Sequence, residues 1–222
     1  MKSLNLLKSY RTFGSGHGTY GLNSQGYRCP EFNQIEWENS ILLFGCSIAF
    51  GIGLNDSETV GHHLSNISNI PIINLAQGGS AYLYQWTNST IIRKNGIMPK
   101  AVIYIWPEES RQTIFDSTDY LSTISINIWN VKNPPNYEDP GISLVLDPYH
   151  PNAVAKHIRD NLNLIWTCPI LHYSFTSTNM DVIHLPPKID RARDDAHPGI
   201  KTTVLWANII AKDLIKNNIL PP

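Results

Sequence analysis

Short, continuous apolar runs alternate along the chain with longer segments of helical spacing. Three runs bounded by Gly, Pro or Asn fit buried strands: residues 41–44 (ILLF), 71–75 (PIINL) and 101–106 (AVIYIW). Two later segments, 168–171 and the shorter 181–184, fit a fourth and a fifth strand. A continuous apolar run of this length predicts a strand that is buried on both faces, as in a parallel sheet.

Helical spacing fills most of the intervals between these runs. Segments 59–67, 81–94 and 151–166 fit helices between strands, and segment 199–216 closes the chain as an amphipathic helix. The apolar candidates of the last helix are Val204, Leu205, Ala207, Ile209, Ile210, Leu214 and Ile215. Strands that alternate with helices imply βαβ units. We therefore predict an α/β fold: a three-layer α/β/α sandwich around a doubly wound parallel sheet of about five strands.

Two segments carry a weaker pattern. Residues 11–40 are rich in Gly, Asn and Ser, so we interpret residues 1–40 as an irregular arm that lies on the domain. The pattern also blurs over residues 107–148, which include a Pro-rich stretch at 133–140. Long insertions of this kind often line a binding site in a compact domain. We expect a single domain over residues 1–222, with the 107–148 insertion near its functional rim.

Composition narrows the class of protein. With 222 residues, 42% of them hydrophobic, the chain is long enough for one domain with a full core. A net charge of −1 gives no basic excess for nucleic acid. No apolar run reaches the roughly 18 residues of a membrane span, and the N-terminus is too weak for a secretory signal. We expect a soluble protein, cytoplasmic or otherwise without a signal peptide, that binds neither nucleic acid nor membrane.

The cysteines point away from two further classes. Cys29, Cys46 and Cys168 are scattered, and no CxxC pair occurs. This pattern argues against a disulfide scaffold and against a structural zinc site, and it fits a reducing compartment.

Candidate chemistry follows the predicted strands, because ligands gather at the carboxyl ends of a parallel sheet. Residues 45–47 (GCS), 78–80 (GGS) and 194–199 (DDAHPG) all fall at this edge. A serine nucleophile needs an imidazole to take its proton, a group to orient that imidazole, and N–H groups for the developing oxyanion. Taken singly, these residues would be a helix cap and two turns, but together they supply every group that this chemistry needs.

These motifs resemble those of the SGNH, or GDSL-like, hydrolases. Residues 44–47 (FGCS) align with the Gly-Asp-Ser block of that family, and residues 74–79 (NLAQGG) look like its second block. The DDAH of residues 194–197 matches the final Asp-x-x-His motif and is followed by Pro-Gly. Residues 23–28 (NSQGYR) look like the segment that often precedes the first block. The resemblance spans nearly the whole chain, with the motifs in order.

The resemblance implies a role for each matching residue. Ser47 would be the nucleophile, His197 the general base and then acid, and Asp194, rather than its neighbour Asp195, the orienting carboxylate. The N–H groups of Ser47 and Gly79 would form part of the oxyanion hole. The activity implied is hydrolysis of a carboxylic ester through an acyl-enzyme, with an O-acyl or O-acetyl group on a carbohydrate as a candidate substrate and with no metal or cofactor.

The chain departs from the family pattern at two positions. Cys46 replaces the family's Asp beside the serine, which leaves a cysteine nucleophile as an alternative. The Asn of the third block aligns with Glu108, and an ionised carboxylate cannot donate a hydrogen bond to an oxyanion. Ser110 or Arg111 could take over oxyanion or substrate binding, although Arg111 could instead form a structural ion pair.

Glu108 therefore keeps a second function open. Losing one oxyanion donor costs about 3 kcal/mol of transition-state stabilisation in a typical acyl-transfer site. The alternative is a catalytically weak or inactive binding module with the same fold, such as a glycan-binding or virion-associated domain. A flavodoxin-like cofactor binder is a third option, but the chain lacks a phosphate-cradling loop.

Overall fold

Five parallel strands form the centre of the molecule in the computed structural model, which describes residues 4–9, 18–109, 111–115, 122–127, 151–176 and 182–221. The strands are β2 (Ile41–Gly45), β3 (Ile72–Asn74), β4 (Ala101–Trp106), β7 (Ile170–Ser174) and β8 (Ile183–His184). Their order is β3-β2-β4-β7-β8, and every neighbouring pair is parallel. The doubly wound parallel sheet predicted from the apolar runs is confirmed.

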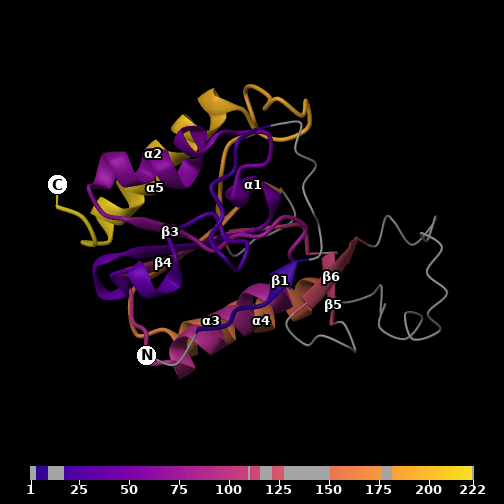
Figure 1. Cartoon of the computed structure of the whole chain (residues 1–222), viewed down its shortest axis with the longest axis vertical. Helices are drawn as coiled ribbons and strands as arrows, with labels where there is room; N and C mark the ends of the chain where they lie inside the picture. Colours follow the sequence, from indigo (N-terminus) through magenta and orange to yellow (C-terminus); the bar gives the residue numbers. More distant parts are fainter. Residues whose placement is uncertain are drawn as a thin grey trace.

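Helices cover both faces of this sheet. Figure 1 shows α2 (Val60–Ser68) and α5 (Ile200–Lys216) on one face, and α3 (Tyr82–Lys94) and α4 (Pro151–Ile165) on the other. The short α1 (Ser47–Phe50) follows β2 directly. The described residues also form three single-turn 3-10 helices: η1 (Phe32–Gln34), η2 (Trp37–Asn39) and η3 (Asp56–Glu58). The three-layer α/β/α sandwich is therefore confirmed, and no helix among the described residues is long and apolar enough to cross a membrane.

A second, smaller sheet lies beside the sandwich. It consists of β1 (Lys8–Ser9), β5 (Arg111–Phe115) and β6 (Ser122–Asn127), in the order β1-β6-β5. β5 and β6 pair antiparallel, and β1 pairs parallel with β6. The sequence did not predict these strands, because their short runs mix polar and apolar residues without a long periodic signal. Of the 107–148 insertion, residues 110, 116–121 and 128–148 lie outside the described residues.

Two hydrophobic cores, one on each face of the sheet, hold the layers together. Alternate residues of β2 and β4 point to opposite faces, as the pleat of a strand requires. One core contains Leu42, Phe44, Val102, Tyr104 and Trp106 with α3 and α4. The other contains Ile41, Leu43, Ala101, Ile103 and Ile105 with α2 and α5. Burial on both faces explains why these strands are apolar at every position.

Several aromatic side chains of α3 and β4 belong to the core. Tyr82, Tyr84 and Trp106 are all buried, and the ring of Tyr82 stacks on Trp106 with the centroids 4.3 Å apart. The apolar face predicted for α5 needs a correction. Val204 and Ile215 are 37% and 38% exposed, because the buried stripe of this helix runs through Thr203, Trp206, Ala207, Ile210, Ala211 and Leu214.

The N-terminal arm reaches the loop behind α1 through Arg28. This side chain is only 4% exposed, and its Nε donates to Asp56 over 2.6 Å. Its two terminal nitrogens donate to main-chain oxygens of Thr19, Phe50, Gly51 and Leu54. Because a guanidinium has five N–H donors in a fixed fork, one residue can hold a whole loop in this way.

Candidate active site

Ser47 lies at a tight corner between β2 and α1. Cys46, with φ −98° and ψ −153°, is the residue before the helix, and Ser47 is the first helical residue. The corner requires Gly45, because a Cβ there would lie 2.4 Å from the Ala49 Cβ and 2.9 Å from the Ile105 oxygen. The apolar strand thus delivers Ser47 to the carboxyl edge of the sheet.

The glycine turn after β3 is attached to the same corner. Gln77 N–H and Ser80 Oγ both donate to the Gly45 oxygen, over 3.1 and 2.8 Å. Gly79, in this turn, has a φ of +77°, which favours glycine. Among the hydrogen bonds of the described residues, none uses the N–H of Ser47 or of Gly79. Two donors next to one corner are therefore available, although Gly79 does not itself line the pocket described below.

Asp194 and His197 form a hydrogen-bonded pair in the turn before α5. The His197 Nδ1 contacts Asp194 Oδ2, and the His197 N–H donates to Oδ1 over 3.0 Å. Burial opposes ionisation of Asp194, but the hydrogen bonds from His197 and from the Ala196 N–H outweigh it, so the pKa of this carboxyl lies below its usual value. Asp195 instead contacts Arg191 over 3.2 Å and is 85% exposed. Asp194, rather than Asp195, is thus the carboxylate bonded to the His197 ring.

An ion pair absent from the sequence expectations anchors this turn. Arg193 donates from both terminal nitrogens to Glu58, over 2.5 and 2.7 Å, and also to the Gly53 oxygen. The hydrogen bond from Arg193 lowers the pKa of Glu58 to about 2. At Gly53, which has a φ of +77°, a Cβ would lie 3.0 Å from Asp194 Oδ1. The turn that carries His197 therefore packs closely against the loop that follows α1.

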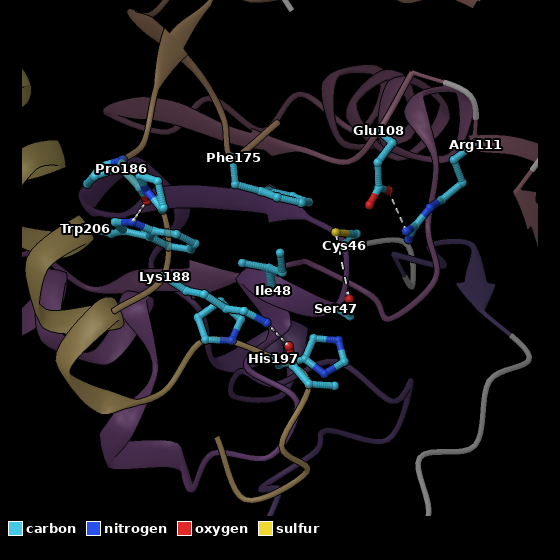
Figure 2. A pocket seen from close by; sticks show the side chains of 13 residues that line it. Cys46, Ser47, Ile48, Glu108, Arg111, Phe175, Pro186, Lys188, His197 and Trp206 are labelled. Atoms are coloured by element: carbon cyan, nitrogen blue, oxygen red, sulfur yellow. Dashed lines mark hydrogen bonds and ion pairs between the residues drawn. The ribbon is translucent and has the colours of Figure 1, made fainter. Parts of the chain in front are cut away.

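Ser47 and His197 line one cavity of about 450 Å³ (Figure 2). The remaining lining residues are Cys46, Ile48, Glu108, Arg111, Phe175, Pro186, Pro187, Lys188, Ala196, Pro198 and Trp206. The Ser47 hydroxyl contacts Cys46 Sγ at 4.0 Å. Among the hydrogen bonds of the described residues, none joins this hydroxyl to the His197 ring. The structure thus brings the serine and the imidazole to the same cavity.

Glu108 and Arg111 pair with each other at the rim of the cavity. Arg111 Nη2 lies 2.7 Å from Glu108 Oε2, and the two side chains are 16% and 37% exposed. The guanidinium therefore compensates the negative charge that occupies the expected donor position, and the ion-pair interpretation of Arg111 agrees with this contact. Ser110 lies outside the described residues. Burial raises the pKa of the Cys46 thiol, although Arg111 opposes the shift, so the reactive thiolate is disfavoured.

One side of the cavity, which we call the apolar wall, consists of Ile48, Phe175, Pro186, Pro187 and Trp206, and all of these except Ile48 lie outside the segments expected from the sequence. The Trp206 Nε1 donates to the Pro186 oxygen over 2.9 Å, which fixes two of these residues against each other. Phe175 follows β7, and the proline pair follows β8. The rule that selected residues after each strand could have found both. Within the described part of the chain, no His, Cys, Asp and Glu side chains gather in a group that could hold a metal ion.

Comparison with known proteins identifies the fold. Neither a scan against protein-family models nor a search of curated proteins finds a match. Three solved structures are similar: a carbohydrate esterase family 2 enzyme of Corynascus thermopiles (Myceliophthora fergusii), a family two carbohydrate esterase of Clostridium thermocellum in complex with cellohexaose, and an acetyl xylan esterase of Butyrivibrio proteoclasticus.

These structures are similar to this chain in architecture, but their sequence identity to it is low. The TM-scores are 0.50, 0.50 and 0.52, and the identities are 11%, 11% and 12%. The matches cover 80%, 83% and 83% of this chain but only 66% of each of the other chains. Identity at this level is evidence for the fold alone. The chain thus has the three-layer α/β/α fold on which these esterases are built, in agreement with the SGNH-type fold expected from its motifs.

Proposed function

We propose that the chain is a serine hydrolase that cleaves a carboxylic ester through Ser47, His197 and Asp194. The observation that carries the proposal is the cavity shared by Ser47 and a His197 ring whose Nδ1 is bonded to a carboxylate. An imidazole held in this way keeps Nε2 free to accept a proton, which is the arrangement that activates a serine hydroxyl.

The reaction follows from these positions. The Ser47 hydroxyl turns from Cys46 Sγ toward His197 by rotation about one side-chain bond, and its oxygen attacks the ester carbonyl as Nε2 takes the proton. The N–H groups of Ser47 and Gly79 stabilise the oxyanion. His197 then gives the proton to the leaving alcohol, which leaves an acyl group on Ser47. Water, deprotonated by the same ring, releases the acid and restores the serine.

Glu108 is the observation that favours the second candidate, a binding module with weak or no catalysis. A carboxylate adds no donor to the oxyanion hole, so the site relies on two N–H groups. A missing donor costs about 3 kcal/mol, or a hundredfold or more in rate. The Arg111 contact limits the repulsion that Glu108 would otherwise exert. We therefore expect a slow hydrolase rather than an inactive one.

For the substrate, we propose an O-acyl group on a carbohydrate. Support comes from the fold, which is similar to that of structures named as carbohydrate esterases, one of them in complex with cellohexaose. The Glu108 side chain at the rim is 37% exposed, so this end of the cavity is open to a large alcohol.

A fluorophosphonate probe tests the mechanism directly. The probe should form a covalent adduct on Ser47, located by mass spectrometry of the digested protein, and the adduct should disappear in Ser47→Ala and in His197→Ala. Asp194→Asn should slow labelling by a large factor, because the ring loses its orienting charge. Absence of labelling in a folded protein would favour the binding module, and an adduct on Cys46 would assign the nucleophile to the thiol.

A further inference from the structure

The cavity around Ser47 has two chemically different ends. The apolar wall forms one end, and the Glu108–Arg111 pair forms the other. Figure 2 shows Phe175, Pro186 and Trp206 on one side of Ser47 and the ion pair on the opposite side. An ester bound across Ser47 would therefore place its two substituents in unlike surroundings.

The sheet order separates the Gly79 turn from the apolar wall but does not by itself separate the two ends, because Glu108 follows β4, on the same side of β2 as β7 and β8. Gly79 follows β3, on one side of the strand that carries Ser47, whereas Phe175 follows β7 and the proline pair follows β8 on the other side. A carbonyl whose oxygen points toward the Gly79 N–H thus has the apolar wall on its far side. Both substituents of the carbonyl carbon point away from its oxygen, so the polarity of each end decides which substituent lies along this wall.

The wall is preformed and offers little to a polar group. Trp206 is 1% exposed, and its Nε1 donates a hydrogen bond to the Pro186 oxygen. The two prolines of the wall have a fixed φ and no N–H. Little conformational freedom is left to lose on binding. Sugar hydroxyls placed here would lose their hydrogen bonds to water without replacement, which is costly. The carboxylate and guanidinium at the opposite end offer both acceptors and donors.

We propose that the apolar wall binds the acyl group of the ester and that the preferred acyl chain is longer than acetyl. This inference rests on the proposed ester hydrolysis and specifies its substrate. The alcohol occupies the end with Glu108 and Arg111. The cavity volume of about 450 Å³ lies within the roughly 300–1,000 Å³ of ligand pockets, and an acetyl group would cover the wall with a single methyl carbon.

A series of 6-O-acyl glucoses with acetyl, butyryl and hexanoyl chains tests the acyl assignment, with kcat/KM as the readout. Burial of one methylene is worth about fourfold in binding, so butyryl, which has two more methylenes, should exceed acetyl by about fifteenfold. Phe175→Ala should reduce the butyryl-to-acetyl ratio at least threefold. Leu164→Ala, which removes an 82% exposed apolar side chain of α4 away from the cavity, should retain the wild-type ratio. Near-UV circular dichroism checks that each variant is folded.

The outcomes separate this inference from the proposed function. Hydrolysis with a butyryl-to-acetyl ratio of one or less in the wild-type protein would overturn the acyl assignment while leaving the hydrolase intact. A second series, methyl, butyl and hexyl acetate, should stay flat; a rise there with a flat acyl series would assign the wall to the alcohol. Failure of every ester together with absence of fluorophosphonate labelling would overturn both proposals.

Discussion

The ion pair between Glu58 and Arg193 offers a direct test of how the His197 turn is held. Glu58→Gln removes the charge and one acceptor but keeps the size of the side chain. Glu58 is 16% exposed and Arg193 is 44% exposed, so the pair is only partly screened by water. Two charge-assisted hydrogen bonds in such a place should contribute about 1–2 kcal/mol to the free energy of unfolding.

The same turn provides a matched control. Arg191 and Asp195 also form an ion pair, over 3.2 Å, but they are 59% and 85% exposed. Breaking this pair with Asp195→Asn should change the free energy of unfolding by at most about 0.5 kcal/mol. Urea unfolding at pH 7 compares the two variants. Glu58→Gln should also lower kcat for ester hydrolysis about tenfold, because a small displacement of His197 is costly.

The pH dependence of the free energy of unfolding provides a second test of the Glu58–Arg193 pair. The pKa of Glu58 is lowered to about 2 in the folded protein, against about 4.3 in an unfolded chain. The stabilisation by Glu58 is therefore fully present above about pH 4.5 and is lost as the pH falls toward about 2. The difference between wild type and Glu58→Gln should shrink over this range. Equal stability and equal kcat for Glu58→Gln and Asp195→Asn would refute the anchoring role.

Three further changes test other parts of the structure. Glu108→Asn should raise kcat at least tenfold by restoring an oxyanion donor, and a decrease would contradict the donor argument. Gly53→Ala and Gly96→Ala both replace a glycine with positive φ, which costs about 1 kcal/mol of stability. Only Gly53 has close neighbours, so Gly53→Ala should lower the free energy of unfolding by about 1–3 kcal/mol more than Gly96→Ala, as measured by thermal unfolding. His172 accepts a hydrogen bond from Trp106 Nε1, and burial lowers the pKa of its ring to about 4. Between about pH 6.5 and 4 the unfolded chain therefore binds more protons than the folded protein. Stability should fall by roughly 3 kcal/mol across that range, and His172→Gln should flatten the fall; an unchanged slope would rule His172 out as its source.

The strands of the main sheet were predictable because a strand that is buried on both faces is apolar at nearly every position. The runs at residues 41–44 and 101–106 are apolar throughout, because successive side chains enter two different cores. The short sheet was not predictable for the opposite reason. β1 has two residues, and β5 and β6 combine polar and apolar positions, so each depends on its partner rather than on its own pattern.

At the candidate site, polar residues were easier to find than apolar ones. Ser47 and His197 were found because they lie at the carboxyl edge of the predicted sheet, in motifs that resemble those of a known family, although each alone would be a helix-cap or turn residue. Trp206 is an aromatic residue within a helix, like many core residues, and only the three-dimensional arrangement places it along a cavity. The motif already favoured Asp194 over Asp195, and in the structure Asp195, which has a φ of 56°, is 85% exposed and contacts Arg191 rather than His197.

Arg28 sets the smallest portion of the chain that could keep the Ser47 corner intact. A fragment that began at β2 would retain every strand of the main sheet and every residue of the proposed reaction. It would also leave the oxygens of Phe50, Gly51 and Leu54 without the guanidinium that they share. The loop behind α1 would then be free to rearrange, and the serine with it. Expression of a truncated protein should therefore preserve the segment from residue 18 onward, although by pattern alone that segment appears dispensable.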